Sequence, residues 1–149
     1  MNQPIEPPRI PVSLVEQIAA IIDTDARQIT NRELLALCKA AGIHGLSTDP
    51  HLCHEVAESA LNLLVTTKYG KRLLSSTDPS TSCTEILKPL QKSVPTQSWR
   101  SAAQTLYQQF SPPASIAYLA SYLLNLTSRA IVLEPSCGPG SLSVWSPSS

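Results

Sequence analysis

The sequence has little charge and no cluster of one sign. Its 149 residues contain 11 Lys and Arg and 11 Asp and Glu, so the formal net charge is zero. The densest basic stretch consists of Lys68, Lys71 and Arg72. Because basic side chains on phosphates supply most non-specific affinity for DNA, this composition excludes a strongly charged nucleic-acid binder. Any contact of this chain alone with DNA should be weak or absent.

The sequence also lacks a long hydrophobic run. The longest apolar stretch, 114–126, is interrupted by serine and tyrosine and is shorter than the roughly 20 residues that a membrane-spanning helix needs. The opening "MNQPIEPPRIP" has no apolar segment of a secretory signal. The four cysteines form no CxxC pair, which favours reduced thiols over a disulfide framework. We therefore expect a cytoplasmic protein that does not associate with membranes.

Several familiar catalytic and metal-binding motifs are absent. The sequence has no Gly-Lys-Ser/Thr of a phosphate-binding loop and no Gly-x-Ser-x-Gly of a hydrolase. His44, His51, Cys53 and His54 fall close together. Only His51 and His54, three residues apart on one predicted helix, could share an ion, because Cys53 points elsewhere. We expect no metal site, and we expect these histidines to face solvent.

What is present is a helical chain with enough apolar residues, 42%, to bury a core. We divide it into an extended proline-rich arm (1–11), a helical region (12–93) and a C-terminal part (94–149). Apolar spacing and capping signals predict helices within the helical region. The first predicted helix is 12–23. The second begins at the capping box Thr30 to Glu33 and ends at Gly42, and the third runs from Pro50 to Gly70. A mobile polar linker at 75–82 and a short helix at 84–92 follow.

The C-terminal part has a different sequence pattern. Two helices are predicted, at 98–110 and 114–126, separated by "SPP". Trp99 and Arg100 could be read as a nucleic-acid contact, but helical spacing favours packing of Trp99 within the protein. "RAIVLEP", residues 129–135, has the length and bounding of a buried parallel strand. A Gly138-Pro139-Gly140 turn follows it, and on spacing alone that turn is equally consistent with an ordinary loop.

Two linked motifs favour a more specific interpretation. "QQFSPP" and, after one helix, "VLEPSCGPG" occur in an order and at a spacing that resemble DNA adenine-N6 methyltransferases dependent on S-adenosylmethionine, in particular the strawberry-notch-like group of bacteria and phages. The resemblance implies a mainly α chain. In it, a helical N-terminal region precedes the helix-helix-strand opening of a class I, Rossmann-like methyltransferase α/β domain, which is incomplete here.

The resemblance also implies a cofactor site for S-adenosylmethionine. Phe110, Ser111 and Pro112 match the segment that lies over the methionine end of the cofactor. Four residues of the loop after the first strand match those near the methionyl and ribose moieties: Glu134, Ser136, Gly138 and Gly140. The sequence departs from the family at Cys137, where alanine is usual, and at Pro139, where threonine or another flexible residue is usual. Proline fixes φ and removes an amide from a loop whose amides face the ligand.

The catalytic tetrad of the family is missing. Adenine methylation needs an Asp/Asn/Ser-Pro-Pro-aromatic sequence, whose aromatic ring stacks on the flipped base. Ser111-Pro112-Pro113-Ala114 imitates this sequence but has alanine in place of the ring. We assign no catalytic residue and expect a truncated, inactive chain with weak or absent cofactor binding, derived from an enzyme that acts on DNA. The alternative is a small helical module that binds a protein partner without catalysis.

Overall fold

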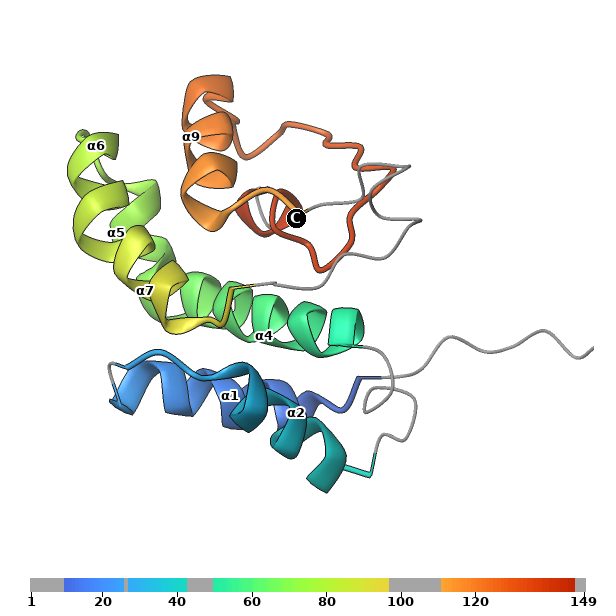
Figure 1. Ribbon diagram of the computed structural model, residues 1–149. Coiled ribbons are helices and arrows are strands. Elements are labelled where there is room, and N and C mark those ends of the chain that lie inside the picture. Colours follow the sequence, from blue (N-terminus) through green and yellow to red (C-terminus); the bar gives the residue numbers. More distant parts are fainter. Residues whose placement is uncertain (1–9, 26, 43–49, 97–110, 147–149) are drawn as a thin grey trace, which may run out of the picture.

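The computed structural model describes residues 10–25, 27–42, 50–96 and 111–146. These residues are mainly helical and contain no β-strand. The order of elements is α1 (Val12–Asp25), α2 (Asn31–Ala40), α4 (Pro50–Leu64), the π-helical turn η1 (Val65–Tyr69), α5 (Gly70–Leu74), α6 (Pro79–Ser82), the π-helical turn η2 (Cys83–Leu87), α7 (Lys88–Ser93), α9 (Ala114–Leu124) and the 3-10 turn η3 (Ser143–Trp145). The long helix α4 separates α1 and α2 from α9 and the C-terminal stretch (Figure 1).

Helices α1 and α2 confirm the predictions made from apolar spacing and capping. The α2 N-terminus has both halves of the capping box: Glu33 N donates to Thr30 Oγ1 at 3.2 Å, and Thr30 N donates to Glu33 Oε2 at 2.8 Å. The chain leaves α2 through Gly42, whose φ is +73°. This left-handed conformation is the usual helix exit for glycine.

The third predicted helix does not end at Gly70, as its glycine suggested. The helical path widens at η1 and then continues through α5 to Leu74. Thr66 and Thr67 cause part of this widening, since both hydroxyls donate back to the Leu63 carbonyl, at 2.9 and 2.7 Å. Gly70 has ordinary helical angles, and a Cβ there would lie 3.3 Å from the Val65 carbonyl oxygen. Gly70 therefore accommodates a close backbone approach inside the helical path.

The segment predicted as a linker, 75–82, is only partly a loop. Its second half is α6, which Asp78 caps by accepting hydrogen bonds from Ser80 N at 3.0 Å and Thr81 N at 3.1 Å. Pro79 follows the cap, at a position where helices tolerate proline. Helix α6 then runs through η2 into α7, so the polar composition reflects a capped helix start rather than a linker.

One hydrophobic core joins the helices of both halves. It contains side chains from α1, α2, α4, η2, α7 and α9, and Trp145 of η3. Tyr118 of α9 packs its ring against Trp145, with 5.1 Å between centroids, and donates its hydroxyl to the Leu73 carbonyl at 2.9 Å. These contacts fix α9 and the C-terminal stretch onto the α4–α5 path.

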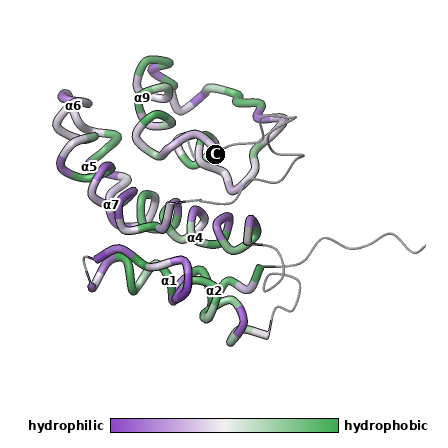
Figure 2. Tube along the Cα trace, in the orientation of Figure 1, coloured by the Kyte–Doolittle hydropathy of each residue, from purple (hydrophilic) through white to green (hydrophobic). Residues whose placement is uncertain are grey.

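The predicted strand at 129–135 is wrong for this chain. The stretch has no regular secondary structure, and Ile131 and Leu133 are 100% and 87% exposed. Figure 2 shows it as a hydrophobic length of chain outside the helices. A parallel strand needs a neighbour for its backbone groups, and the described residues supply no strand to pair with it. The strand of the predicted helix-helix-strand opening is therefore absent from the part of the chain that the structure describes.

Other predictions fall outside the described residues. These are most of the proline-rich arm, His44, and the predicted helix at 98–110 with Trp99 and Arg100. No helix within the described ranges is long and apolar enough to cross a membrane.

Candidate functional site

One face of α4 carries a line of polar residues into the interior of the protein. His54, Glu58 and Asn62 are spaced four residues apart, which places them on the same face of the helix. His54 and Asn62 are only 5% and 6% exposed, and Glu58 is half-buried. The expectation that the histidines near this helix start face solvent is therefore wrong for His54, because the second half of the chain covers this face.

A cavity of about 290 Å³ lies against this face. Its other walls are the end of α7 with the residues that follow it, and the segment from Ser111 to Ala114 that leads into α9. Ser141, from the loop after the glycine turn, completes the lining. The cavity therefore lies where the helical region meets the two motifs on which the resemblance rests.

The two motifs lie close together at this cavity. A Cβ built on Gly138 would be 3.5 Å from the Ser111 hydroxyl oxygen. Gly138 has a φ of +48° and Gly140 a φ of +88°, conformations that side-chain-bearing residues rarely adopt. Ser111 and Pro112 both line the cavity. The glycine turn thus has the backbone shape that glycine provides, and its first glycine faces the serine of the other motif.

Helix α4 holds the glycine turn in place through Asn62. Its amide nitrogen donates to the Pro139 carbonyl at 2.9 Å and approaches the Ser141 hydroxyl at 3.4 Å. The turn closes on itself through a bond of 2.7 Å from Gly140 N to the Cys137 carbonyl. Pro139 therefore contributes a carbonyl to the packing of the turn, at the position where the family usually has threonine.

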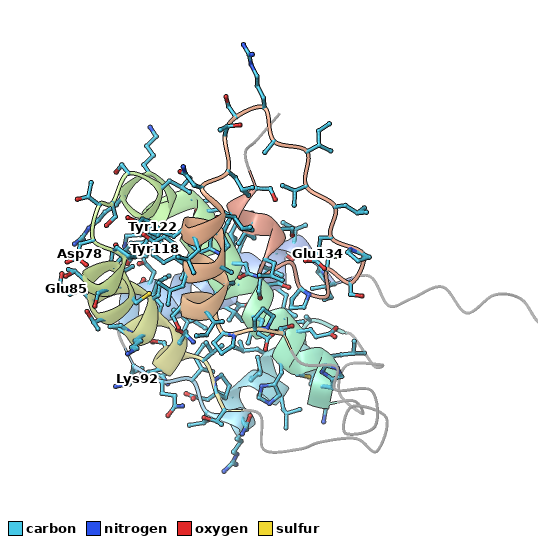
Figure 3. The ribbon with its side chains drawn as sticks, turned by 90° about the horizontal axis from the view of Figure 1, so that it is seen from above. Asp78, Glu85, Lys92, Tyr118, Tyr122 and Glu134 are labelled. Carbon is cyan, nitrogen blue, oxygen red and sulfur yellow. The ribbon has the colours of Figure 1, made fainter. Side chains whose placement is uncertain are left out.

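None of the four predicted residues of the glycine loop is in the cavity lining, and this includes Gly138 and Gly140. Glu134 Oε1 accepts a hydrogen bond from Ser136 N at 3.1 Å, which forms a local turn. Figure 3 shows Glu134 on the stretch that leads into the glycine turn, away from Asp78 and Glu85 of the α6–η2 segment. Phe110 lies outside the described residues. The structure thus brings Ser111, Pro112 and Gly138 together, and leaves Glu134 and Ser136 at the edge of the site.

The electrostatics of the cavity depend on two titratable groups. Burial raises the pKa of Glu58; a hydrogen bond with Ser111 opposes this shift, nearby Glu55 reinforces it and His51 opposes it. Burial, and then the charge of His51, lower the pKa of His54. The other lining residues are uncharged. Among the described lining residues, the cavity therefore has one acid, and most of its lining surface is apolar.

Sequence reasoning missed the contribution of α4 to this site. The signal is present in the sequence, since His54, Glu58 and Asn62 recur every four residues in a helix that also carries an apolar stripe. A polar line with this spacing indicates a helix face that meets another polar surface.

Other sites in the described residues offer less. Two larger hollows, of about 480 and 450 Å³, lie beside Trp145, and neither is lined by a predicted site residue. Within the described ranges, no group of three His, Cys, Asp or Glu side chains could hold a metal ion. Comparison with protein-family models, with curated proteins and with solved structures finds no match to this chain.

Proposed function

We propose that this chain carries part of the S-adenosylmethionine site of a DNA adenine-N6 methyltransferase. The observation that supports the proposal is the approach of Gly138 to Ser111, since these residues belong to the two motifs that resemble the family. In such an enzyme the cofactor supplies an activated methyl group for the exocyclic nitrogen of adenine.

Within this proposal, the chain retains weak cofactor binding and does not methylate DNA by itself. Its sequence has no Pro-Pro-aromatic tetrad to hold a flipped adenine. Ser111 and Pro112 would form the wall at the methionine end, and the positive-φ glycines would let the backbone come close to the ligand. Glu134 and Ser136 would reach the cofactor only if the stretch before the glycine turn moved toward the cavity.

Calorimetric titration of the chain with S-adenosylmethionine tests the proposal. Gly138→Val should abolish the binding heat, because valine is strained at this φ and its side chain points at Ser111. Gly42→Val is the matched control: its φ of +73° imposes similar strain, but nothing lies within 4 Å of the added Cβ. Absence of heat with the unaltered chain, or equal loss in both variants, would contradict the proposal.

The second candidate is a helical module that binds a protein partner without catalysis. The observation that favours it is the exposure of four large apolar side chains, Leu123 and Leu124 at the end of α9 and Ile131 and Leu133 in the following stretch, each at least two-thirds exposed. Apolar side chains that gather in an exposed patch often mark interaction sites. A two-hybrid interaction that is lost in the double variant Ile131→Asp, Leu133→Asp but kept in Gly138→Val would favour this candidate.

A further inference from the structure

Glu58 is a carboxylate of the cavity wall that belongs to neither of the two motifs. It comes from the middle of α4 and is hydrogen-bonded to Ser111 across the cavity wall. Asn62, one turn further along the helix, holds the glycine turn by its bond of 2.9 Å to the Pro139 carbonyl. The acid therefore lies beside the Ser111 segment, one helical turn from the residue that holds the glycine turn.

Among the described residues that line the cavity, Glu58 has no basic partner that is fully charged. None of them is a lysine or arginine, and the one other titratable side chain among them is His54, whose neutral form burial favours. The remaining polar groups of the lining, such as those of Gln91, Thr96 and Ser141, are neutral. A half-buried carboxylate in such surroundings is best stabilised by a ligand that brings a positive charge and hydrogen-bond donors.

We infer that Glu58 of the helical region binds the cationic amino group of the ligand in this cavity, and so acts as a specificity residue for the methionine end of the cofactor. The inference rests on the proposed function, since S-adenosylmethionine has an ammonium group at this end. The volume, about 290 Å³, lies at the lower limit of small-molecule sites, roughly 300 Å³. That size suits the amino-acid portion of the cofactor.

If Glu58 binds the ammonium group, ligand binding changes the protonation of its carboxyl, which a purely structural glutamate would not show. A cation placed beside Glu58 favours its ionised form and so lowers the pKa of the carboxyl, which burial raises in the unbound chain. Ligand binding should then release protons. Among the described residues, the nearby groups that also titrate or carry charge are His51, His54 and Glu55, all on α4.

The test is calorimetric titration of the full chain with S-adenosylmethionine in two mildly acidic buffers of different ionisation enthalpy. The unaltered chain should release protons on binding. Glu58→Gln keeps the shape and an acceptor for Ser111, so it should remain folded, as thermal unfolding will check. We expect it to bind about tenfold or more weakly and to lose the proton release. Glu16→Gln, which changes an exposed acid of α1, should change neither quantity.

The outcomes separate this inference from the proposed function. If the unaltered chain binds and releases no protons, or if Glu58→Gln binds as tightly as the unaltered chain, the inference is wrong and the cofactor site stands. If Glu58→Gln and Glu16→Gln weaken binding equally, the effect comes from overall charge and the inference is also wrong. If the unaltered chain gives no heat, the proposed function fails and this assignment fails with it.

Discussion

Replacing Asn62 by alanine should loosen the glycine turn from α4. Asn62 is buried, and its amide group makes the one bond of good length between α4 and the turn, 2.9 Å to the Pro139 carbonyl. The second contact, 3.4 Å to the Ser141 hydroxyl, is too long to add much. The variant therefore tests whether one side chain couples the helical region to the candidate site.

The expected loss is about 1 kcal/mol in the free energy of unfolding. A neutral hydrogen bond contributes roughly 0.5–1.5 kcal/mol, and the Pro139 carbonyl, being only partly buried, can find water in its place. For a chain of this size such a loss lowers the melting temperature by about 2–4 °C. Urea and thermal unfolding measure both quantities.

The control is Ser59→Ala on the same helix. Ser59 is partly buried, and among the described residues its hydroxyl bonds to the Glu55 carbonyl within α4, at 2.8 Å. Its replacement should change stability by less than about 0.5 kcal/mol. Hydrogen exchange should become faster around Pro139 and Ser141 in Asn62→Ala and stay unchanged in Ser59→Ala. Unchanged exchange in both variants would refute the idea that Asn62 holds the turn.

Three further predictions concern the fold. Tyr118→Phe should lower the unfolding free energy by about 1–2 kcal/mol, because it removes the buried hydroxyl that donates to the Leu73 carbonyl. Tyr122→Phe removes an exposed hydroxyl that lies 3.5 Å from the Thr77 carbonyl, and it should have almost no effect in the same urea titration. The hydrogen bonds from Thr30 lower the pKa of Glu33. The capping box should therefore stabilise the fold fully above the ordinary glutamate pKa of about 4.3 and lose this contribution as the pH falls through the lowered pKa. Thr30→Ala should reduce this acid sensitivity in thermal melts measured at several pH values. A thiol reagent should modify the exposed Cys137 in the native chain and the other cysteines only after denaturation. The reason is that Cys38, Cys53 and Cys83 are buried, and burial raises the pKa of Cys38 to about 12. Fast labelling of a second cysteine in the native chain would contradict the packing.

Local signals in the sequence were enough to predict most helices. The capping box at Thr30 and the left-handed exit at Gly42 are determined by a few neighbouring residues, and both are confirmed. The continuation past Gly70 was not predictable in the same way, because the glycine is required by a close approach of the Val65 carbonyl inside a widened turn. Local composition cannot distinguish that requirement from a helix end.

The strand and the site could not be predicted from local sequence signals, because both depend on contacts between distant segments. "IVL" at 131–133 has the composition of a buried strand, yet a strand exists only when another strand pairs with it, and the described residues provide none. Conversely, the meeting of Ser111 with Gly138 was expected only from the resemblance. The contribution of Asn62 and Glu58 depends on tertiary packing, although their four-residue spacing was visible in the sequence.

The most direct test of the central claim is mapping of amide chemical shifts during titration of the labelled chain with S-adenosylmethionine. The account predicts shifts that saturate and cluster around Glu58 and Asn62 on α4, around Ser111 and Ala114, and around Gly138 to Ser141, with α1 and α2 unaffected. Absence of saturable shifts, or shifts confined to the hollows beside Trp145, would contradict the claim that these segments form a cofactor site.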